Sequence, residues 1–246
     1  MKNYKLPEYV DRKDSLVAFI DILGFDEKVR NIKSEDDFQE VATLLFSIKE
    51  VEKKYGNEKK LRPNLNITAI SDSVILSIPI SDSTSVVSLF SLLHRFQYEL
   101  LIKFKTLIRG YITRGFVYQK DNIVFGKGYS EAYKKENQIG HAPRIVLDHV
   151  LVEDAKRVVS KNKNRENDFS VFDFLIEDHC DGSHFLDYLK PVGELVGISK
   201  QQYLDERAAI KSFINVNLTN HRDDQKVIRV YKWLNNYYLS TDRYFT

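Results

Sequence analysis

The stretch VAFIDILGF, residues 17–25, contains the features that decide the fold: apolar residues in a row, an aspartate, and a glycine before phenylalanine. The continuous apolar run predicts a strand over residues 15–23 with both faces covered. A carboxylate, Asp21, near the end of such a strand needs a partner. A second aspartate, Asp72, lies between two apolar runs in ITAISDSVILS, residues 67–77. We predict that these two aspartates are partners.

The pattern on either side of these aspartates alternates between strand and helix periodicity. We expect helices over residues 35–55, from the Ser81–Ser85 cluster to about 104, and over 129–137, and strands over 15–23, 65–71, 73–80, 106–119, 122–126 and 143–148. This order predicts an α+β fold with a ferredoxin-like core, in which an antiparallel-dominated sheet carries two helices on one face.

Two regions follow from this pattern. Residues 1–150 form the predicted core, and residues 151–246 form an extension packed on it that we expect to be mainly helical. Its expected helices are VLVEDAKRVVSK, residues 150–161, followed by 199–217 and 224–239. We expect KNKNREND, residues 161–168, to form an exposed loop. We expect DGSHFLDYLKPV, residues 181–192, to mediate an interaction or to support a dimer.

Composition limits the class of protein. The chain has 246 residues, 43% of them hydrophobic, and 37 basic against 35 acidic residues leave a net charge of +2. This balance does not favour binding to nucleic acid or to a membrane surface. The single cysteine, the polar N-terminal segment and the lack of a long apolar run predict a cytoplasmic protein.

The predicted topology brings Asp21 and Asp72 to one edge of the sheet. Two adjacent carboxylates repel each other unless a cation or a shared proton intervenes, and Mg²⁺ or Mn²⁺ prefers such oxygen ligands. Gly24 and Phe25 follow in a turn whose backbone N–H groups can cradle phosphates. A metal pair beside this turn suits a nucleoside triphosphate. In the alternative reading, Asp21 caps a helix and Asp72 lies in an ordinary turn.

Several segments resemble class III nucleotidyl cyclases, in the order of that family. FIDILGF, residues 19–25, resembles the family's metal-binding strand and turn, and SDS, residues 71–73, matches its second metal aspartate. IRGYITRG, residues 108–115, resembles the strand with the triphosphate-contacting arginine, here Arg109. VFGKGYSEAY, residues 124–133, resembles G-x-x-V-N-x-A-A-R, which would begin at Gly126. The resemblance spans residues 15–150 and implies a palm-type core.

The departures from the family pattern concern the ribose and the base. Ser130 stands where the family has a ribose-orienting asparagine, and Lys134 stands where it has an arginine that stabilises the transition state. Thr68 and Ile123 stand at the purine-reading positions. Together the segments look most like the bacterial pyrimidine (uridylate or cytidylate) cyclases of the Pycsar antiphage system.

That resemblance implies conversion of UTP or CTP to a 3′,5′-cyclic monophosphate and pyrophosphate. It also implies a homodimer with composite sites, two Mg²⁺ or Mn²⁺ ions per site, and a cyclic product that acts on a separate effector. The implied metal ligands are Asp21, Asp72 and the carbonyl of Ile22. The implied substrate contacts are Gly24, Phe25, Thr68, Arg109 and Ser130, with Lys134 as a catalytic residue; Ser130 and Lys134 would come from the partner chain.

Three alternatives remain open at the level of sequence. One is a purine cyclase that reads its base through other residues. Another is a cyclase-like protein that binds nucleotide without catalysis, which the replacements at Ser130 and Lys134 favour. The third, another palm-type enzyme such as a polymerase or diguanylate cyclase, lacks support because no GG-D/E-E-F-like turn is present. Arg109 could also form only an ion pair, and Lys134 could lie on a solvated helix face.

Overall fold

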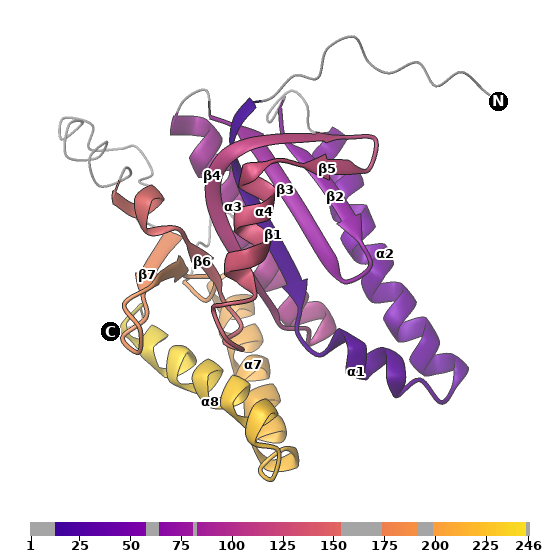
Figure 1. The fold of residues 1–246 in the computed structure, drawn as a ribbon. Helices are drawn as coiled ribbons and strands as arrows, with labels where there is room; N and C mark the ends of the chain where they lie inside the picture. Colours follow the sequence, from indigo (N-terminus) through magenta and orange to yellow (C-terminus); the bar gives the residue numbers. More distant parts are fainter. Residues whose placement is uncertain (1–12, 58–63, 81–82, 154–173, 191–198, 245–246) are drawn as a thin grey trace.

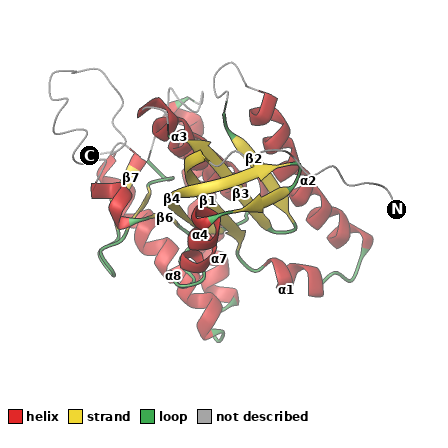
Figure 2. Ribbon diagram, turned by 45° about the horizontal axis from the view of Figure 1, so that its top comes forward, coloured by secondary structure: helices red, strands yellow, loops and turns green. Residues whose placement is uncertain are grey.

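The computed structural model describes residues 13–57, 64–80, 83–153, 174–190 and 199–244. A twisted sheet lies between helices on its two faces (Figures 1 and 2). The strands are β1 (Lys13–Ile22), β2 (Asn66–Ile70), β3 (Ser73–Pro79), β4 (Ile108–Lys120), β5 (Ile123–Phe125), β6 (Ile145–Leu147), β7 (Leu175–Glu177) and β8 (His184–Leu186). The helices are α1 (Phe25–Arg30), α2 (Glu35–Asn57), α3 (Ser83–Phe104), α4 (Lys127–Glu136), α7 (Lys200–Asn220), α8 (Gln225–Ser240) and the 3₁₀ turn η2 (Thr241–Tyr244).

The sheet order confirms the predicted fold class. The strands lie in the order β2-β3-β1-β4-β6-β8-β7, and β5 pairs with β4. Strands β2, β3, β1 and β4 pair antiparallel, in the order of a ferredoxin-like core, while β4 and β6 pair parallel. The fold is therefore α+β with a mostly antiparallel sheet, and β1 lies in its centre.

Burial on both faces explains the continuous apolar run of β1. Leu16, Ala18 and Ile20 pack into the core beneath α2 and α3. Val17 and Phe19, which point to the opposite face, pack with residues of α4. Because side chains alternate along a strand, the face of Val17 and Phe19 is also the face of Asp21.

Glycines allow α4 to lie close against the sheet. A Cβ atom on Gly115 of β4 would come within 2.9 Å of the Cα of Gly128, and a Cβ on Gly128 would come within 2.9 Å of the Val17 side chain. Gly126, which precedes α4, has φ +136, a conformation that favours glycine. The G-x-G spacing in VFGKGY is thus required by the packing of α4.

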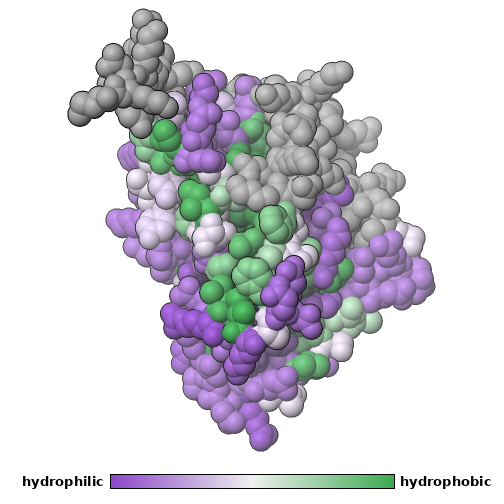
Figure 3. All heavy atoms as spheres, turned by 90° about the vertical axis from the view of Figure 1, so that its right-hand side faces the viewer, coloured by the Kyte–Doolittle hydropathy of each residue, from purple (hydrophilic) through white to green (hydrophobic). Residues whose placement is uncertain are grey.

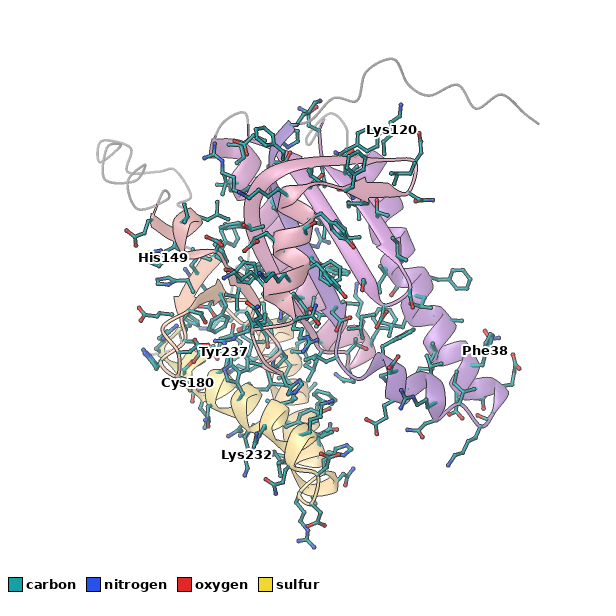
Figure 4. All side chains as sticks on the ribbon, viewed as in Figure 1. Phe38, Lys120, His149, Cys180, Lys232 and Tyr237 are labelled. Carbon is teal, nitrogen blue, oxygen red and sulfur yellow. The ribbon has the colours of Figure 1, made fainter. Side chains whose placement is uncertain are left out.

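The β4–β5 hairpin forms an arm with an apolar surface. It turns at Asp121 and Asn122, both with positive φ, and Lys120 lies near its tip (Figure 4). Phe116, Ile123 and Phe125 are each about half exposed, at 47%, 56% and 51%. On the face in Figure 3, apolar side chains gather in a band between hydrophilic regions.

The described part of the C-terminal extension is mainly helical, as predicted, but it also contains strands that were not predicted. Helices α7 and α8 are confirmed, but β7 and β8 extend the central sheet beyond β6. Strands of three residues are too short to show a period of two, so the sequence pattern did not reveal them. Phe185 and Leu186 are buried, so this part of the segment expected to mediate interactions belongs to the core. Residues 149–153 are helical, which covers the start of the helix expected over 150–161. The rest of that helix and the loop expected over 161–168 lie outside the described residues.

Arg144 connects the sheet to α8. Its side chain is 4% exposed and forms ion pairs with Asp178 and Asp181. Trp233 Nε1 of α8 donates a 2.7 Å hydrogen bond to Asp178. The Arg144 guanidinium also lies over the rings of Phe185 and Trp233, 5.9 and 5.7 Å from their centroids. Among the described helices, none has the length and apolar character required to cross a membrane.

Candidate active site

The site is built around the end of β1. Asp21 pairs in register with Ser73 of β3 and with Arg109 of β4, so residues from two neighbouring strands flank it. Its side chain is 22% exposed. Residues 15–20 before it and Ile22 after it are buried, so Asp21 is the partly exposed side chain at this end of the strand.

The structure brings Asp72 to the same place. It lies in the tight turn between β2 and β3, after Ser71, which has φ 54. The backbone N–H of Ile22, the residue after Asp21, donates a 3.2 Å hydrogen bond to the carbonyl oxygen of Asp72. The backbone segments that carry the two aspartates therefore lie side by side. Burial raises the pKa of Asp21; Arg109 opposes this effect, and the charge of Asp72 adds to it. The two carboxylates are thus close enough to repel each other.

Arg109 is held by groups from three parts of the chain. Its Nη2 atom lies 3.4 Å from Asp21 Oδ2, and its Nη1 atom donates to the carbonyl of Gly140 at 3.1 Å. Its Nε atom forms an ion pair with Glu136, the last residue of α4. The Arg109 side chain is 16% exposed. The cluster of Asp21, Asp72, Glu136 and Arg109 therefore has three carboxylates and one cation.

Glu136 was not predicted from the sequence. The buried face of α4 consists of Gly128, Ala132 and Glu136, which recur every four residues. A carboxylate at this spacing, on the packed face of the helix, was the available signal. Burial raises the pKa of Glu136, with Arg109 opposing and the charge of Asp21 adding to the shift.

The donor set fits the predicted divalent ions. Asp21 and Asp72 are neighbouring hard oxygen ligands whose repulsion Arg109 relieves only in part. The Ile22 carbonyl belongs to the residue that follows Asp21 and whose N–H donates to the Asp72 carbonyl. Within the described residues, no group of three or more His, Cys, Asp or Glu side chains is arranged to hold a metal. Two carboxylates suit an ion such as Mg²⁺ that takes its other ligands from water and phosphate.

Gly24 and Phe25, in the turn after Asp21, differ in burial. Gly24 has φ 75 and is exposed, and a Cβ added to it would meet no atom within 4 Å. Phe25 begins α1 and is 7% exposed in the hydrophobic core. Only the backbone of Phe25 therefore remains available to a ligand, while the Phe25 ring fixes the turn.

Thr68 lies away from the carboxylates, on β2. It is 4% exposed, and its hydroxyl oxygen accepts a 2.9 Å hydrogen bond from Gln119 Nε2. Gln119 Nε2 also donates to the Ile75 carbonyl at 3.0 Å, which fixes the orientation of the amide. Gln119, from the end of β4, is a second residue that the motifs did not identify.

Ser130 and Lys134 lie on α4 and are exposed. Their helix packs on β1 through an aromatic cluster in which Phe19 lies 5.2 Å from Tyr133, centroid to centroid, and 6.2 Å from Tyr129. No contact of Ser130 or Lys134 side chains with the carboxylate cluster is observed in the described residues. The structure thus brings together Asp21, Asp72 and Arg109, and it leaves Thr68, Ser130 and Lys134 apart from them.

Comparison with known proteins gave matches only among solved structures. No protein-family model and no curated protein sequence matches the chain. The adenylyl cyclase CyaB from P. aeruginosa matches with a TM-score of 0.47 at 18% identity, over 61% of this chain and 84% of that one. The guanylyl cyclase domain of the RhoGC fusion protein from Blastocladiella emersonii matches with a TM-score of 0.48 at 13% identity, over 72% and 96%.

A third match is a class III adenylyl cyclase-like ATP-binding protein from Pseudomonas aeruginosa, with a TM-score of 0.41 at 17% identity, over 70% of this chain and 41% of that one. These structures are cyclase or cyclase-like domains.

Proposed function

We propose that this chain is a nucleotidyl cyclase that converts UTP or CTP to the 3′,5′-cyclic monophosphate and pyrophosphate. The observation that carries the proposal is the cluster of Asp21, Asp72 and Arg109 on adjoining strands. The carboxylates outnumber the cationic groups and can bind a metal ion, and the Arg109 guanidinium can bind phosphate oxygens through two nitrogens. A metal-bound triphosphate requires both kinds of group. The ordered family-like motifs add support.

In the proposed reaction, the ribose 3′-oxygen forms a bond to the α-phosphorus. The bond between the α-phosphorus and its bridging oxygen breaks, pyrophosphate leaves with the electron pair, and the hydroxyl proton is released. Mg²⁺ or Mn²⁺ held by Asp21, Asp72 and the Ile22 carbonyl would acidify the hydroxyl and neutralise phosphate charge. Arg109 would bind the β- and γ-phosphates through its terminal nitrogens, and the Gly24 backbone would lie against the triphosphate.

The positions of Ser130 and Lys134 support a homodimer with composite sites. Both residues are exposed on α4, so each can face the site of a second copy, where Ser130 would orient the ribose and Lys134 would stabilise the α-phosphate. The apolar arm with Phe116, Ile123 and Phe125 offers a surface for that copy.

Thr68 supports a pyrimidine, and uracil in particular. It is neither the lysine nor the glutamate expected of a purine-reading site. A hydroxyl that accepts a hydrogen bond from Gln119 keeps its own hydrogen for donation. That hydrogen can be donated to the carbonyl at position 4 of uracil, whereas cytosine has an amino group there. By its resemblance to the Pycsar cyclases, the product would be a second messenger in antiphage defence that activates a separate effector.

Two other functions have specific support. A purine cyclase is consistent with the same carboxylates and arginine, because neither contacts the base. A nucleotide-binding protein without catalysis is favoured by the contacts that engage Arg109 and by lysine at position 134, since lysine lacks the bidentate fork of arginine.

The deciding experiment is to incubate the purified full-length chain with Mn²⁺ and each of the four nucleoside triphosphates separately, and to identify the products by mass spectrometry. We expect cyclic UMP, with cyclic CMP as the lesser product. Predominant cyclic AMP or cyclic GMP would establish the purine alternative. Binding of UTP without a cyclic product, also in the presence of extract from phage-infected cells, would establish the non-catalytic alternative.

A further inference from the structure

Glu136 occupies an unfavourable position for a carboxylate. It is 2% exposed at the C-terminal end of α4, where the helix dipole disfavours negative charge. The neighbouring Lys134 and Lys135 follow the usual preference for basic residues in the last turn. Burial also raises the pKa of Glu136. A buried ion pair commonly stabilises a fold less than apolar residues of the same size, so stability alone does not account for this side chain.

The contact that Glu136 makes is specific. It forms its ion pair with the Nε atom of Arg109 and so engages the inner edge of the guanidinium. The terminal nitrogens of Arg109 have weaker or neutral partners, Asp21 at 3.4 Å and the Gly140 carbonyl at 3.1 Å. An arginine has five donors in one rigid plane, so a charge that fixes Nε also fixes the direction of both Nη groups.

We infer that Glu136 is a positioning residue: it anchors Arg109 by Nε, so that the two Nη groups can exchange Asp21 and the Gly140 carbonyl for phosphate oxygens. The identity of the phosphate ligand rests on the proposed function. Without this anchor, Arg109 has Asp21 as its remaining ionic partner at 3.4 Å. It would then turn towards the carboxylate, and the chain would bind polyphosphate less tightly.

A positioning role and a structural role predict opposite results. Replacement of Glu136 by glutamine keeps the size of the side chain and removes a buried charge, so a positioning role predicts unchanged or higher thermal stability with weaker phosphate binding. A purely structural role predicts lower thermal stability with unchanged binding by the folded chain.

The test uses inorganic tripolyphosphate with Mg²⁺ as the probe and calorimetry as the measurement. We expect E136Q to weaken binding by about tenfold, the effect of losing one charged contact worth about 1.4 kcal/mol, and E136D to bind more tightly than E136Q. E131Q is the matched control, because Glu131 lies on the same helix and its charge acts on Tyr111; it should bind as the wild type does. In an R109A background, E136Q should cause no further loss.

Three outcomes would overturn the inference: E136Q binds tripolyphosphate as the wild type does, its full effect persists in R109A, or R109A itself leaves binding unchanged. Formation of a cyclic product is a separate readout. If no triphosphate is cyclised while binding still depends on Glu136 through Arg109, the proposed function fails and the positioning role stands. Where the chain is active, E136Q should raise the KM for the triphosphate more than it lowers kcat.

Discussion

Two arginines of this fold each lie between two carboxylates, and their surroundings differ. Arg144 is 4% exposed, and Asp178, Asp181 and the rings of Phe185 and Trp233 surround it. Arg109 is 16% exposed, and one of its carboxylates, Asp21, is also close to a further aspartate. Arg144 thus has both of its terminal nitrogens paired with carboxylates, while Arg109 lies among excess negative charge.

The pKa values express the same difference. Partial burial acts to raise the pKa of Asp181, but hydrogen bonds from Arg144 and Ser183 prevail and lower it to about 2. At the other arginine, burial prevails and raises the pKa of Asp21. A compensated network stabilises the fold, whereas an uncompensated one is suited to attract a cation. The comparison therefore separates a structural arginine, Arg144, from Arg109, the arginine that we propose binds phosphate.

The largest effect should come from the aspartates beside Arg109. Asp21→Ala and Asp72→Ala should each lower turnover by about a thousandfold or more, because several kcal/mol of metal-dependent stabilisation would be lost. The measurement is the rate of cyclic nucleotide formation with Mn²⁺. Asp14→Asn is the control on the same strand, since Asp14 forms a 2.6 Å surface ion pair with Arg114 and should keep full activity. Turnover that survives either alanine variant would remove the basis of the proposed function.

Replacing each arginine by lysine should give contrasting results. Arg144→Lys cannot preserve the paired contacts to Asp178 and Asp181, and loss of a buried pair should reduce the free energy of unfolding by about 3–5 kcal/mol. Arg109→Lys keeps a positive charge beside Glu136 in a site that is more exposed, so it should reduce the free energy of unfolding by less than Arg144→Lys does, but it should lower kcat/KM by about a hundredfold, as does loss of one charge-stabilising donor. Urea unfolding and steady-state kinetics on both variants would test this. Equal effects on stability would erase the distinction between the two arginines.

The smallest effect concerns stability and pH. The depressed pKa of Asp181 gives the folded chain stability that is present above its ordinary pKa of 3.8 and is lost as the pH falls towards about 2. The raised pKa of Asp21 has the opposite sign: its contribution is present below 3.8 and is lost as the pH rises through the folded pKa.

At pH 7 without divalent metal, Asp181→Asn should therefore lower the melting temperature and Asp21→Asn should raise it. Asp181→Asn should also lose less stability than the wild type between pH 4 and pH 2. Thermal melts followed by circular dichroism would show both effects. Shifts of the same sign for the two variants would contradict the assignment of the two networks.

The sequence allowed most of the core fold to be predicted, because the deciding elements carry long periodic patterns. The buried strand through Asp21 and the hairpin around Asp72 lie where their patterns indicate. The elements that were missed, α1, β7 and β8, have six residues or fewer. Segments of this length gain their structure from tertiary packing, as Phe185 does in the core.

The site was partly predictable for a related reason. Asp21, Asp72 and Arg109 occur in recognisable motifs on strands whose order fixes their neighbours. Glu136 and Gln119 make contacts over 27 and 51 residues of sequence, to Arg109 and Thr68. No local pattern encodes such distant partners, so only the three-dimensional arrangement could reveal them.

The placement of Glu136 has a consequence for a pair of chains. In one ten-residue helix, α4, Ser130 and Lys134 are exposed while Glu136 holds the arginine of its own chain. In the proposed dimer, this helix would therefore touch both reaction centres. Because a short helix moves as one rigid unit, a shift at one end of α4 also moves its other end. Substrate binding at the first site should therefore alter substrate binding or turnover at the second site. Such an enzyme would show half-of-the-sites reactivity or a Hill coefficient different from one.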